Sequence, residues 1–342
     1  MHFQFISIII PTYNRAALLP LTLDSVLAQD YPADCFEILV GNNNSPDATQ
    51  AVLEEYARRE PRIRPFFESR QGVHYVRNGA AYLAKGDILY FTDDDMIADP
   101  AMLRHLVSVF ADTRVGAATG KVLPRWEASP PSWVLRLMKN SLLSLHDAGD
   151  EAFSGEADFG VYSCHQAVRR EALFRAGGFN PENTAGFWIG DGETGLNIKI
   201  KKLGYHFAYA PGAITYHIIP PHRLTQRYLN NRLANQGNCD AYTAYRRDRP
   251  TSRQLVRQIF RQIAQPPDRG MLICLLQVIW RLLVRRNGDG ARMALGQFFY
   301  YRNSLLYDCN LLISAVWRAM VLRDDWLEKG APEAVGSADG VS

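Results

Sequence analysis

Short apolar runs alternate with helical patterns along the first part of the chain, and this alternation constrains the fold more than any other sequence feature. The predicted strands are Phe5–Ile10, Glu37–Val40, Ile63–Phe67 and Asp87–Thr92, and the predicted helices are Ala16–Gln29, Ser45–Arg58 and Val73–Ala84. Strands and helices that alternate at this spacing indicate βαβ units. The fold class is therefore α/β, with a Rossmann-like, mostly parallel sheet flanked by helices.

Polar clusters follow three of these strands. They are Thr12-Tyr13-Asn14-Arg15, Asn42-Asn43-Asn44 and Asp93-Asp94-Asp95. Ligands of open α/β sheets bind beyond the carboxyl ends of the strands. We therefore expect the three clusters to converge on one crevice.

Composition narrows the class of protein. The chain has 342 residues, of which 47% are hydrophobic and 21% charged, which excludes a disordered chain. Its five cysteines include no CxxC pair, which argues against a disulfide framework or a zinc site and favours the cytoplasm. The N-terminus lacks the pattern of a signal peptide. The most apolar stretch, Met271–Val284, is too short to span a membrane.

The three adjacent aspartates directly follow an apolar strand. Adjacent carboxylates repel one another unless a cation neutralises them, and Mg²⁺ in proteins is usually held by one or two carboxylates and substrate phosphates. Alternate residues of a strand face the same side, so Asp93 and Asp95 are expected at one site while Asp94 points elsewhere. The alternative is a loop of solvated charges.

Other polar residues stand at positions suited to a ligand. Residues 12–15 open a helix and suit a nucleotide, although they also fit an ordinary turn. Asp191 and Glu193 lie in the glycine-rich segment Gly190–Gly195, which is predicted to be a loop before a helix. A carboxylate there can act as a general base or cap the helix. Arg77 could reach a base or a diphosphate, or form a surface ion pair. His217 is structural unless Asp95 lies nearby, in which case its imidazole completes a metal site.

Taken together, these segments resemble the family 2 glycosyltransferases, which have the GT-A fold. The resemblance rests on SIIIPTYNR, EILVGNNNSPDAT, VRNGAAYLAKGDILYFTDDDMIADPAML, RREALFRAGGF and GDGETGLNIKIKKLGYHFAYAPGAITYH, in that order. It covers residues 5–225. It implies an inverting, hexosyltransferase-type enzyme that moves a sugar from a nucleotide diphosphate sugar to an acceptor hydroxyl, with Mg²⁺ or Mn²⁺ bound at a DxD site.

The resemblance also implies a role for each matching position. It assigns Pro11, Thr12, Tyr13 and Arg15 to the nucleotide pocket, Asn42 and Arg77 to the base or pyrophosphate, Asp93 and Asp94 to the nucleotide, Asp95, Asp93 and His217 to the metal, and Glu193, with Asp191 as its rival, to catalysis. Asn42 stands where the family usually has an aspartate that accepts the ring N–H of the base, so the identity of the base stays open.

The chain is expected to divide at the proline pair near residue 220. Residues 1–222 would form the catalytic domain, with a nucleotide-binding half (1–123) and an acceptor half (124–222). Residues 223–330 would form a helical region, and residues 331–342 a flexible tail.

Residues 223–287 contain thirteen arginines, no lysine and three acidic residues. Arg253, Arg257 and Arg261 form one helical stripe, and Met271–Val284 suits a membrane interface, where it would bring the enzyme to a lipid-linked acceptor; a glycan is the other acceptor expected. The alternative is a helical subdomain packed on the core or on a second copy of the chain.

Three other functions compete with glycosyl transfer. A nucleotidyltransferase would carry a glycine-rich loop with arginine and lysine after the first strand, and PTYNR lacks it. A non-catalytic nucleotide-sugar-binding or scaffold protein need not keep Asp93, Asp95 and Glu193. Nucleic-acid binding is the weakest reading, because the arginine-rich part matches no recognised module.

Overall fold

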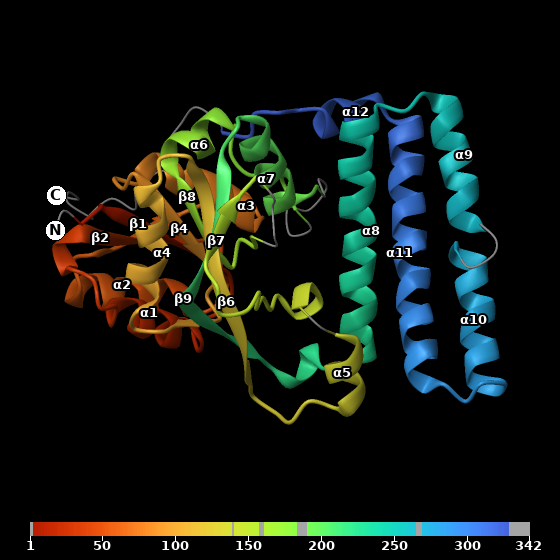
Figure 1. Cartoon of the computed structure of the whole chain (residues 1–342), viewed down its shortest axis with the longest axis horizontal. Coiled ribbons are helices and arrows are strands. Elements are labelled where there is room, and N and C mark those ends of the chain that lie inside the picture. Colours follow the sequence, from red (N-terminus) through yellow and green to blue (C-terminus); the bar gives the residue numbers. More distant parts are fainter. Residues whose placement is uncertain (1–2, 139, 157–160, 183–189, 265–268, 328–342) are drawn as a thin grey trace, which may run out of the picture.

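The computed structural model of this chain describes residues 3–138, 140–156, 161–182, 190–264 and 269–327. A part built around a β-sheet stands beside a group of long helices that run roughly parallel or antiparallel to one another (Figure 1).

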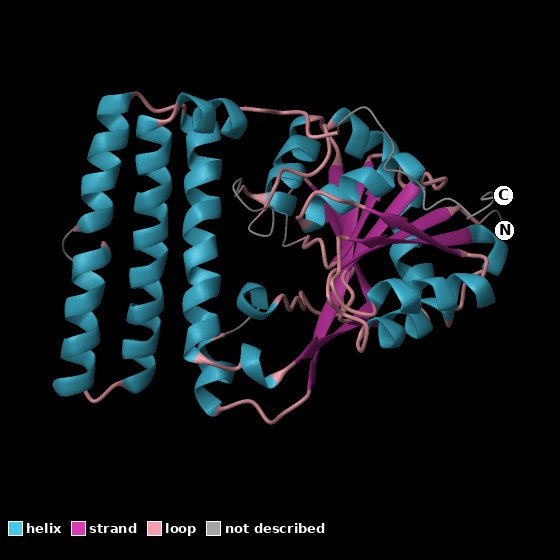
Figure 2. Cartoon of the chain, turned by 180° about the vertical axis from the view of Figure 1, so that it is seen from behind, coloured by secondary structure: helices cyan, strands magenta, loops and turns pink. Residues whose placement is uncertain are grey.

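Nine strands within the described residues form one sheet (Figure 2). They are β1 (Ile6–Thr12), β2 (Phe36–Asn42), β3 (Ile63–Phe67), β4 (Ile88–Thr92), β5 (Met96–Ala98), β6 (Val115–Trp126), β7 (Phe153–Gly155), β8 (His165–Arg169) and β9 (His206–Ile219). Their order is β3-β2-β1-β4-β8-β6-β9-β5, and β7 pairs with β9. The first four strands of this order are mutually parallel, as predicted. Beyond β4 the sheet is mixed, because β8 runs antiparallel to both β4 and β6.

The sheet is covered by helices on both faces. These helices are α1 (Leu19–Leu27), α2 (Thr49–Arg59), α3 (Val73–Leu83), α4 (Met102–Ser108), α6 (Arg170–Arg175) and α7 (Gly192–Lys202). Side chains of one strand alternate between the two faces. Ile8 and Ile10 of β1 therefore pack in one core cluster, which includes residues of α1, α2 and α4, and Ile9 packs in the other, with residues of α3, α6 and α7.

Two local boundaries affect the site. β8 continues to Arg169, and α6 ends just before Gly177 and Gly178, which both take positive φ angles. The segment Gly190–Gly195, predicted as a loop, contains the start of α7. Glu193 therefore stands in the first turn of a helix, where a carboxylate is favoured by the helix dipole.

The second part of the molecule is helical. It contains α8 (Gln226–Asp248), α9 (Ser252–Ile263), α10 (Met271–Leu283), α11 (Gly288–Ile313) and α12 (Ala315–Val321), and α5 (Ser132–Leu137) from the sheet part packs near its base. The long helix α11 lies between α8 on the sheet side and α9 and α10 on the outer side (Figure 1). No helix in the described residues is both long and apolar enough to cross a membrane.

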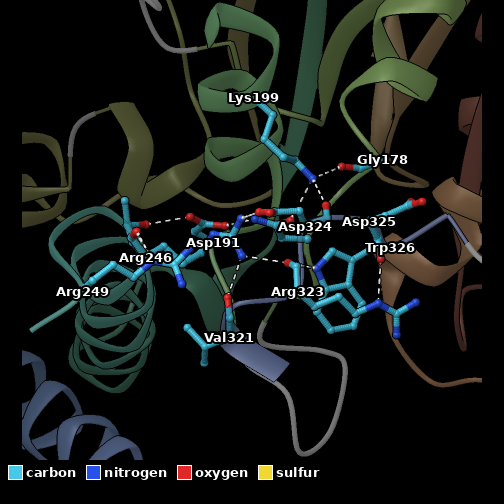
Figure 3. A network of polar contacts seen from close by, with 12 residues as sticks. Gly178, Asp191, Lys199, Arg246, Arg249, Val321, Arg323, Asp324, Asp325 and Trp326 are labelled. Atoms are coloured by element: carbon cyan, nitrogen blue, oxygen red, sulfur yellow. Dashed lines mark hydrogen bonds and ion pairs between the residues drawn. The ribbon is translucent and has the colours of Figure 1, made fainter. Parts of the chain in front are cut away.

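After α12 the chain returns to the sheet part. We call residues 322–327 the C-terminal strap. Arg246 of α8 donates to the carbonyl oxygens of Val321 (2.6 Å) and Arg323 (2.8 Å), and it pairs with the Asp324 carboxylate (Figure 3). Lys199 of α7 donates to the Asp324 carbonyl at 3.2 Å. The strap thereby links the end of α8 to the helix that carries Glu193.

Candidate active site

A cleft of about 480 Å³ opens at the carboxyl ends of the first strands, where the sequence predicts it. It is lined by Pro11, Thr12, Tyr13, Arg15, Asn43, Gln71, Val73, His74, Arg77, Asp93, Asp94, Asp95, Ser141, Ser144, Tyr162, Ser163, Cys164, Glu182, Glu193, Thr194, His217, Arg223, Tyr228, Arg232 and Gln236. The aspartate cluster converges here in full, residues 12–15 contribute all but Asn14, and the asparagine cluster contributes Asn43. One wall of the cleft is formed by α8 and the turn before it.

The three aspartates connect β4 to β5, and each has a different cationic partner. Asp93 accepts a 2.5 Å hydrogen bond from Arg77, and Asp94 lies 3.6 Å from Arg15. Asp94 lines the cleft as well, so the prediction that it points away is wrong. Burial and the neighbouring Asp95 raise the pKa of Asp94.

Asp95 lies beside His217. The Asp95 Oδ2 atom is 3.6 Å from His217 Nε2, and the backbone N–H of Ile218 donates to the Asp95 carbonyl at 3.0 Å. Arg223 donates to the same Oδ2 at 2.8 Å. Burial alone would raise the pKa of Asp95, but its hydrogen-bonding and cationic neighbours hold it below its usual value.

The Asp95–His217 pair fits a divalent cation with two protein ligands. Two ligands bound to one Mg²⁺ at 2.0–2.1 Å stand about 3 Å apart when they are at right angles, and further apart at wider angles. The observed 3.6 Å is wider than the right-angle spacing, so the two atoms would move closer together on binding one Mg²⁺. The described residues contain no group of three or more histidine, cysteine or acidic side chains that could hold a metal by themselves. Substrate oxygens and water would therefore supply the remaining ligands.

Glu193 also lines the cleft, where its carboxylate lies beside His74. His74 Nε2 is 3.7 Å from Glu193 Oε2, and its Nδ1 is 3.2 Å from Arg77 Nη1. A guanidinium can only donate, so Nδ1 of His74 accepts and Nε2 carries the proton that faces Glu193. Burial raises the pKa of Glu193, but His74 and Arg77 outweigh it and lower this pKa to about 2. The carboxylate is therefore ionised at neutral pH.

Asp191 occupies a different environment, although it is only two residues away. It precedes α7 and accepts hydrogen bonds from Asn180 Nδ2 (2.7 Å) and Thr243 Oγ1 (2.8 Å). It is buried, and among the described residues it does not line the cleft. Burial raises its pKa in spite of the two hydrogen bonds. Figure 3 places it beside the contacts that hold the C-terminal strap.

Most of the residues that were expected to contact a nucleotide line the cleft. Tyr13 is 47% exposed, so its ring is accessible to a ligand. Arg77 lines the cleft, but its guanidinium is used by Asp93, His74 and Ser163. Asn42 is buried instead: its Nδ2 donates to Gln50 and its Oδ1 accepts from the Ser45 backbone.

Several cleft residues were not predicted. His74 stands three residues before Arg77 on α3, so the i,i+3 spacing would have placed it on the same helical face. Tyr228, Arg232 and Gln236 recur every four residues along α8. Their spacing indicates a shared face, but nothing local in the sequence indicates that this face meets the sheet.

Comparison with known proteins gives relatives that act on sugars. The sequence model described as "Glycosyl transferase family 2" matches residues 7–177. The chain is similar to validoxylamine A glucosyltransferase of Streptomyces hygroscopicus subsp. jinggangensis, with 36% identity over 124 residues, 36% of this chain and 28% of the relative. It is also similar to the probable glycosyltransferase YdaM of Bacillus subtilis, with 24% identity over 225 residues, 62% of this chain and 50% of the relative. The matches thus span from about a quarter to a half of these relatives' lengths.

Solved structures share the fold at lower identity. Mannosyltransferase PcManGT from Pyrobaculum calidifontis, solved with GDP-Man and Mn²⁺, superposes with a TM-score of 0.54 at 21% identity, covering 94% of this chain and 84% of that one. GalNAc-T7, solved with UDP, GalNAc and Mn²⁺, gives 0.50 at 20% identity, covering 64% and 43%. The sheet and its helices therefore have the GT-A arrangement. With a family match over half of its length and this fold, the chain belongs to glycosyl transferase family 2.

Proposed function

We propose that this protein transfers a hexose from a nucleoside diphosphate sugar to an acceptor hydroxyl, with inversion at the anomeric carbon and with Mg²⁺ or Mn²⁺ as cofactor. One observation carries the proposal: Asp95 and His217 stand within metal-sharing distance in the same cleft as the ionised Glu193. The two solved neighbours, which contain nucleotides and Mn²⁺, support it.

Different residues of the cleft would contact the sugar donor and the acceptor. Tyr13 and Arg15 would contact the nucleotide, and Asp93, held by Arg77, would contact the ribose. A divalent ion at Asp95 and His217 would stabilise the negative charge that the departing diphosphate acquires.

Glu193 would take the proton of the acceptor hydroxyl. The hydroxyl oxygen then bonds to the anomeric carbon as the bond from that carbon to the diphosphate oxygen breaks, and the products are a glycoside and a nucleoside diphosphate. Inversion follows because the base and the leaving group stand on opposite sides of the sugar ring. General-base assistance of this kind contributes about 10²–10⁴-fold to a rate.

The first test is thermal unfolding against a panel of nucleotides and nucleotide sugars, with and without Mn²⁺. A ligand at 100 times its dissociation constant stabilises a protein by about 2.7 kcal/mol. We expect one nucleoside diphosphate family to raise the melting temperature only with Mn²⁺, and Asp95→Ala to abolish the effect. The panel also identifies the base.

The same assay separates the competing functions. A nucleotidyltransferase would release pyrophosphate, whereas the proposed reaction releases a nucleoside diphosphate. A scaffold protein would bind the donor and turn over none. Absence of any metal-dependent shift would contradict a metal-assisted donor site.

We also propose that the protein works in the cytoplasm, at the inner face of the membrane, on a lipid-linked acceptor. The support is the outward surface of α9 and α10, the helices farthest from the sheet (Figure 1). The α9–α10 face comprises the exposed apolar residues Val256, Phe260, Leu272, Leu275, Leu276, Ile279, Trp280, Leu282 and Leu283. So many exposed large apolar side chains on two neighbouring helices favour an interaction site there.

The charges around the α9–α10 face favour an anionic bilayer as its partner. Residues 249–287 contain eight arginines and a single acidic residue, Asp268. Each arginine near an anionic leaflet contributes about 1 kcal/mol. Two copies of the same basic surface would repel each other, so the charges oppose self-association through this face.

Vesicle sedimentation tests the membrane proposal. We expect the protein to sediment with phosphatidylcholine vesicles that contain phosphatidylglycerol, more weakly with phosphatidylcholine alone, and less at high salt. The double variant Leu276→Glu/Leu283→Glu should lower the affinity at least about tenfold, since burying each leucine is worth about 1.5–3 kcal/mol. Leu21→Glu/Leu135→Glu, on exposed leucines of α1 and α5, is the matched control. A wild-type dimer that the first variant makes monomeric, without vesicle binding, would instead identify a subunit interface.

A further inference from the structure

Arg223 stands directly between the two residues that fit a metal ion. It ends the short 3₁₀ turn Pro221–Arg223, four residues after β9 ends at Ile219. Its Nη2 donates to Asp95 Oδ2 at 2.8 Å, and its Nη1 lies 2.5 Å from His217 Nε2. One guanidinium thus contacts both candidate ligand atoms.

The protonation of His217 follows from its partners. Its Nδ1 lies 2.8 Å from the carbonyl oxygen of Leu143, which can only accept, so Nδ1 carries the proton. The guanidinium can only donate, so Nε2 of His217 accepts from Arg223. The Nε2 lone pair and the Asp95 Oδ2 lone pair therefore point to the same place, and Arg223 fills it.

These two lone pairs are the ones a divalent cation would use. Backbone pairing fixes their spacing, because Met96 pairs with His217 in the register of β5 and β9 and Ile218 donates to Asp95. Asp95 is buried, and a buried carboxylate without a counter-charge is costly. Some cation must therefore stay at this position as long as Asp95 is ionised.

We propose that Arg223 is the resident cation of the metal site and that it must leave before Mg²⁺ or Mn²⁺ can bind. This inference rests on the proposed metal-assisted transfer. The exchange keeps Asp95 neutralised throughout, and it makes the metal compete with an internal guanidinium. The side chain of Arg223 is 15% exposed, so it has a route to solvent. A donor diphosphate would favour the exchange, because its charge attracts both the incoming metal and the released guanidinium.

Competition of this kind has a direct consequence for metal affinity. Without nucleotide, the wild-type protein should bind Mn²⁺ weakly, and a nucleoside diphosphate should strengthen that binding. Removing the charge at residue 223 should strengthen the binding of Mn²⁺ alone. Coupling between mutually exclusive cations is commonly worth about 5–150-fold in affinity.

The experiment measures Mn²⁺ binding to the full-length protein, without nucleotide, by the electron paramagnetic resonance signal of free Mn²⁺. The variants are Arg223→Gln, which keeps a donor for Asp95 but no charge, and Arg223→Lys, which keeps the charge. We expect Arg223→Gln to bind Mn²⁺ at least about tenfold more tightly than wild type. Arg223→Lys should stay closer to wild type than Arg223→Gln does, because lysine keeps the charge although it loses the two-pronged contact.

Two controls assign the result to the site. Arg232→Ala removes another cleft arginine, one that donates to the Ser141 carbonyl at 2.7 Å, and it should leave Mn²⁺ affinity unchanged. Adding Asp95→Asn to Arg223→Gln should remove the gained affinity.

Two outcomes would overturn the inference. Equal Mn²⁺ affinity of wild type and Arg223→Gln would show that Arg223 does not compete with the metal. No Mn²⁺ binding by any variant, even with a nucleoside diphosphate, would make Arg223 a permanent cation of the site. Donor binding measured in EDTA separates that second case from a failure of the glycosyltransferase proposal, because a permanently arginine-neutralised site would still bind donor without metal.

Discussion

Replacing Glu193 by glutamine is expected to lower kcat by about 10²–10⁴-fold, whereas Asp191→Asn should keep kcat within about tenfold of wild type. The glutamine is nearly isosteric and can still accept from His74, but it cannot take a proton. Asp191 faces Asn180 and Thr243 rather than the cleft. The Asp191→Asn substitution should therefore affect packing more than the rate of the chemical step. Steady-state kinetics on the donor identified by the nucleotide panel measures both values.

The pH dependence of kcat/KM provides an independent test of the same assignment. His74 and Arg77 lower the pKa of Glu193 to about 2, so this base is already ionised across the neutral and mildly acidic range. We expect no loss of kcat/KM from Glu193 as the pH falls from about 8 to about 5. Burial raises the pKa of Asp191, so a base at Asp191 would titrate at higher pH than an ordinary aspartate. A full loss of activity in Asp191→Asn with an active Glu193→Gln would reverse the assignment.

Trp326→Ala is expected to lower the free energy of unfolding by about 3–5 kcal/mol, the usual cost of removing a buried tryptophan side chain. Trp326 is only 4% exposed, although it lies near the end of the described chain. Its backbone N–H donates to Gly177 at 2.9 Å, and its carbonyl accepts from Asn78 at 3.3 Å. The truncation should therefore release the C-terminal strap from the sheet part. Urea unfolding of the purified protein measures the loss.

Trp280→Ala is the matched control for this loss. Trp280 is 46% exposed on α10 and has Arg285 over its ring, an exposed contact worth about 0.5–1 kcal/mol. Its removal should thus cost less than about 1 kcal/mol. Equal unfolding midpoints for Trp326→Ala and wild type would show that the strap is not docked in solution. A fall in kcat as well would indicate that the strap positions α7 or Arg77, the neighbour of Asn78.

The sequence predicts the parts of this site that depend on local patterns, and it misses those that depend on contacts between distant segments. β1 to β4 were predicted because their apolar runs and the helices between them follow from local periodicity. Asp93, Asp95, Thr12, Tyr13 and Arg15 do meet at the cleft, since strand ends in a parallel sheet share one edge. The proximity of His217 to Asp95, which the sequence leaves open, depends on a pairing of β5 with β9 that no local pattern specifies.

The errors have equally local causes. Glycines on both sides of Asp191 and Glu193 indicated a loop, but Gly192 takes a φ of +50° and begins α7 without breaking it. Asn42 was aligned with the base, but its amide completes the turn before α2 and leaves the cleft to Asn43. The docking of Trp326 on Asn78 joins residues 248 positions apart, which no spacing rule can anticipate.

The wall that α8 contributes to the cleft is fixed near both of its ends. Just before its first turn, Arg223 donates to Asp95, and near its last turn Arg246 donates to the strap. Because α8 also packs along α11, neither pivoting nor rotation of this helix is free of lost contacts. If Arg223 leaves Asp95, the contacts of Arg246 still hold the far end of this wall to the strap.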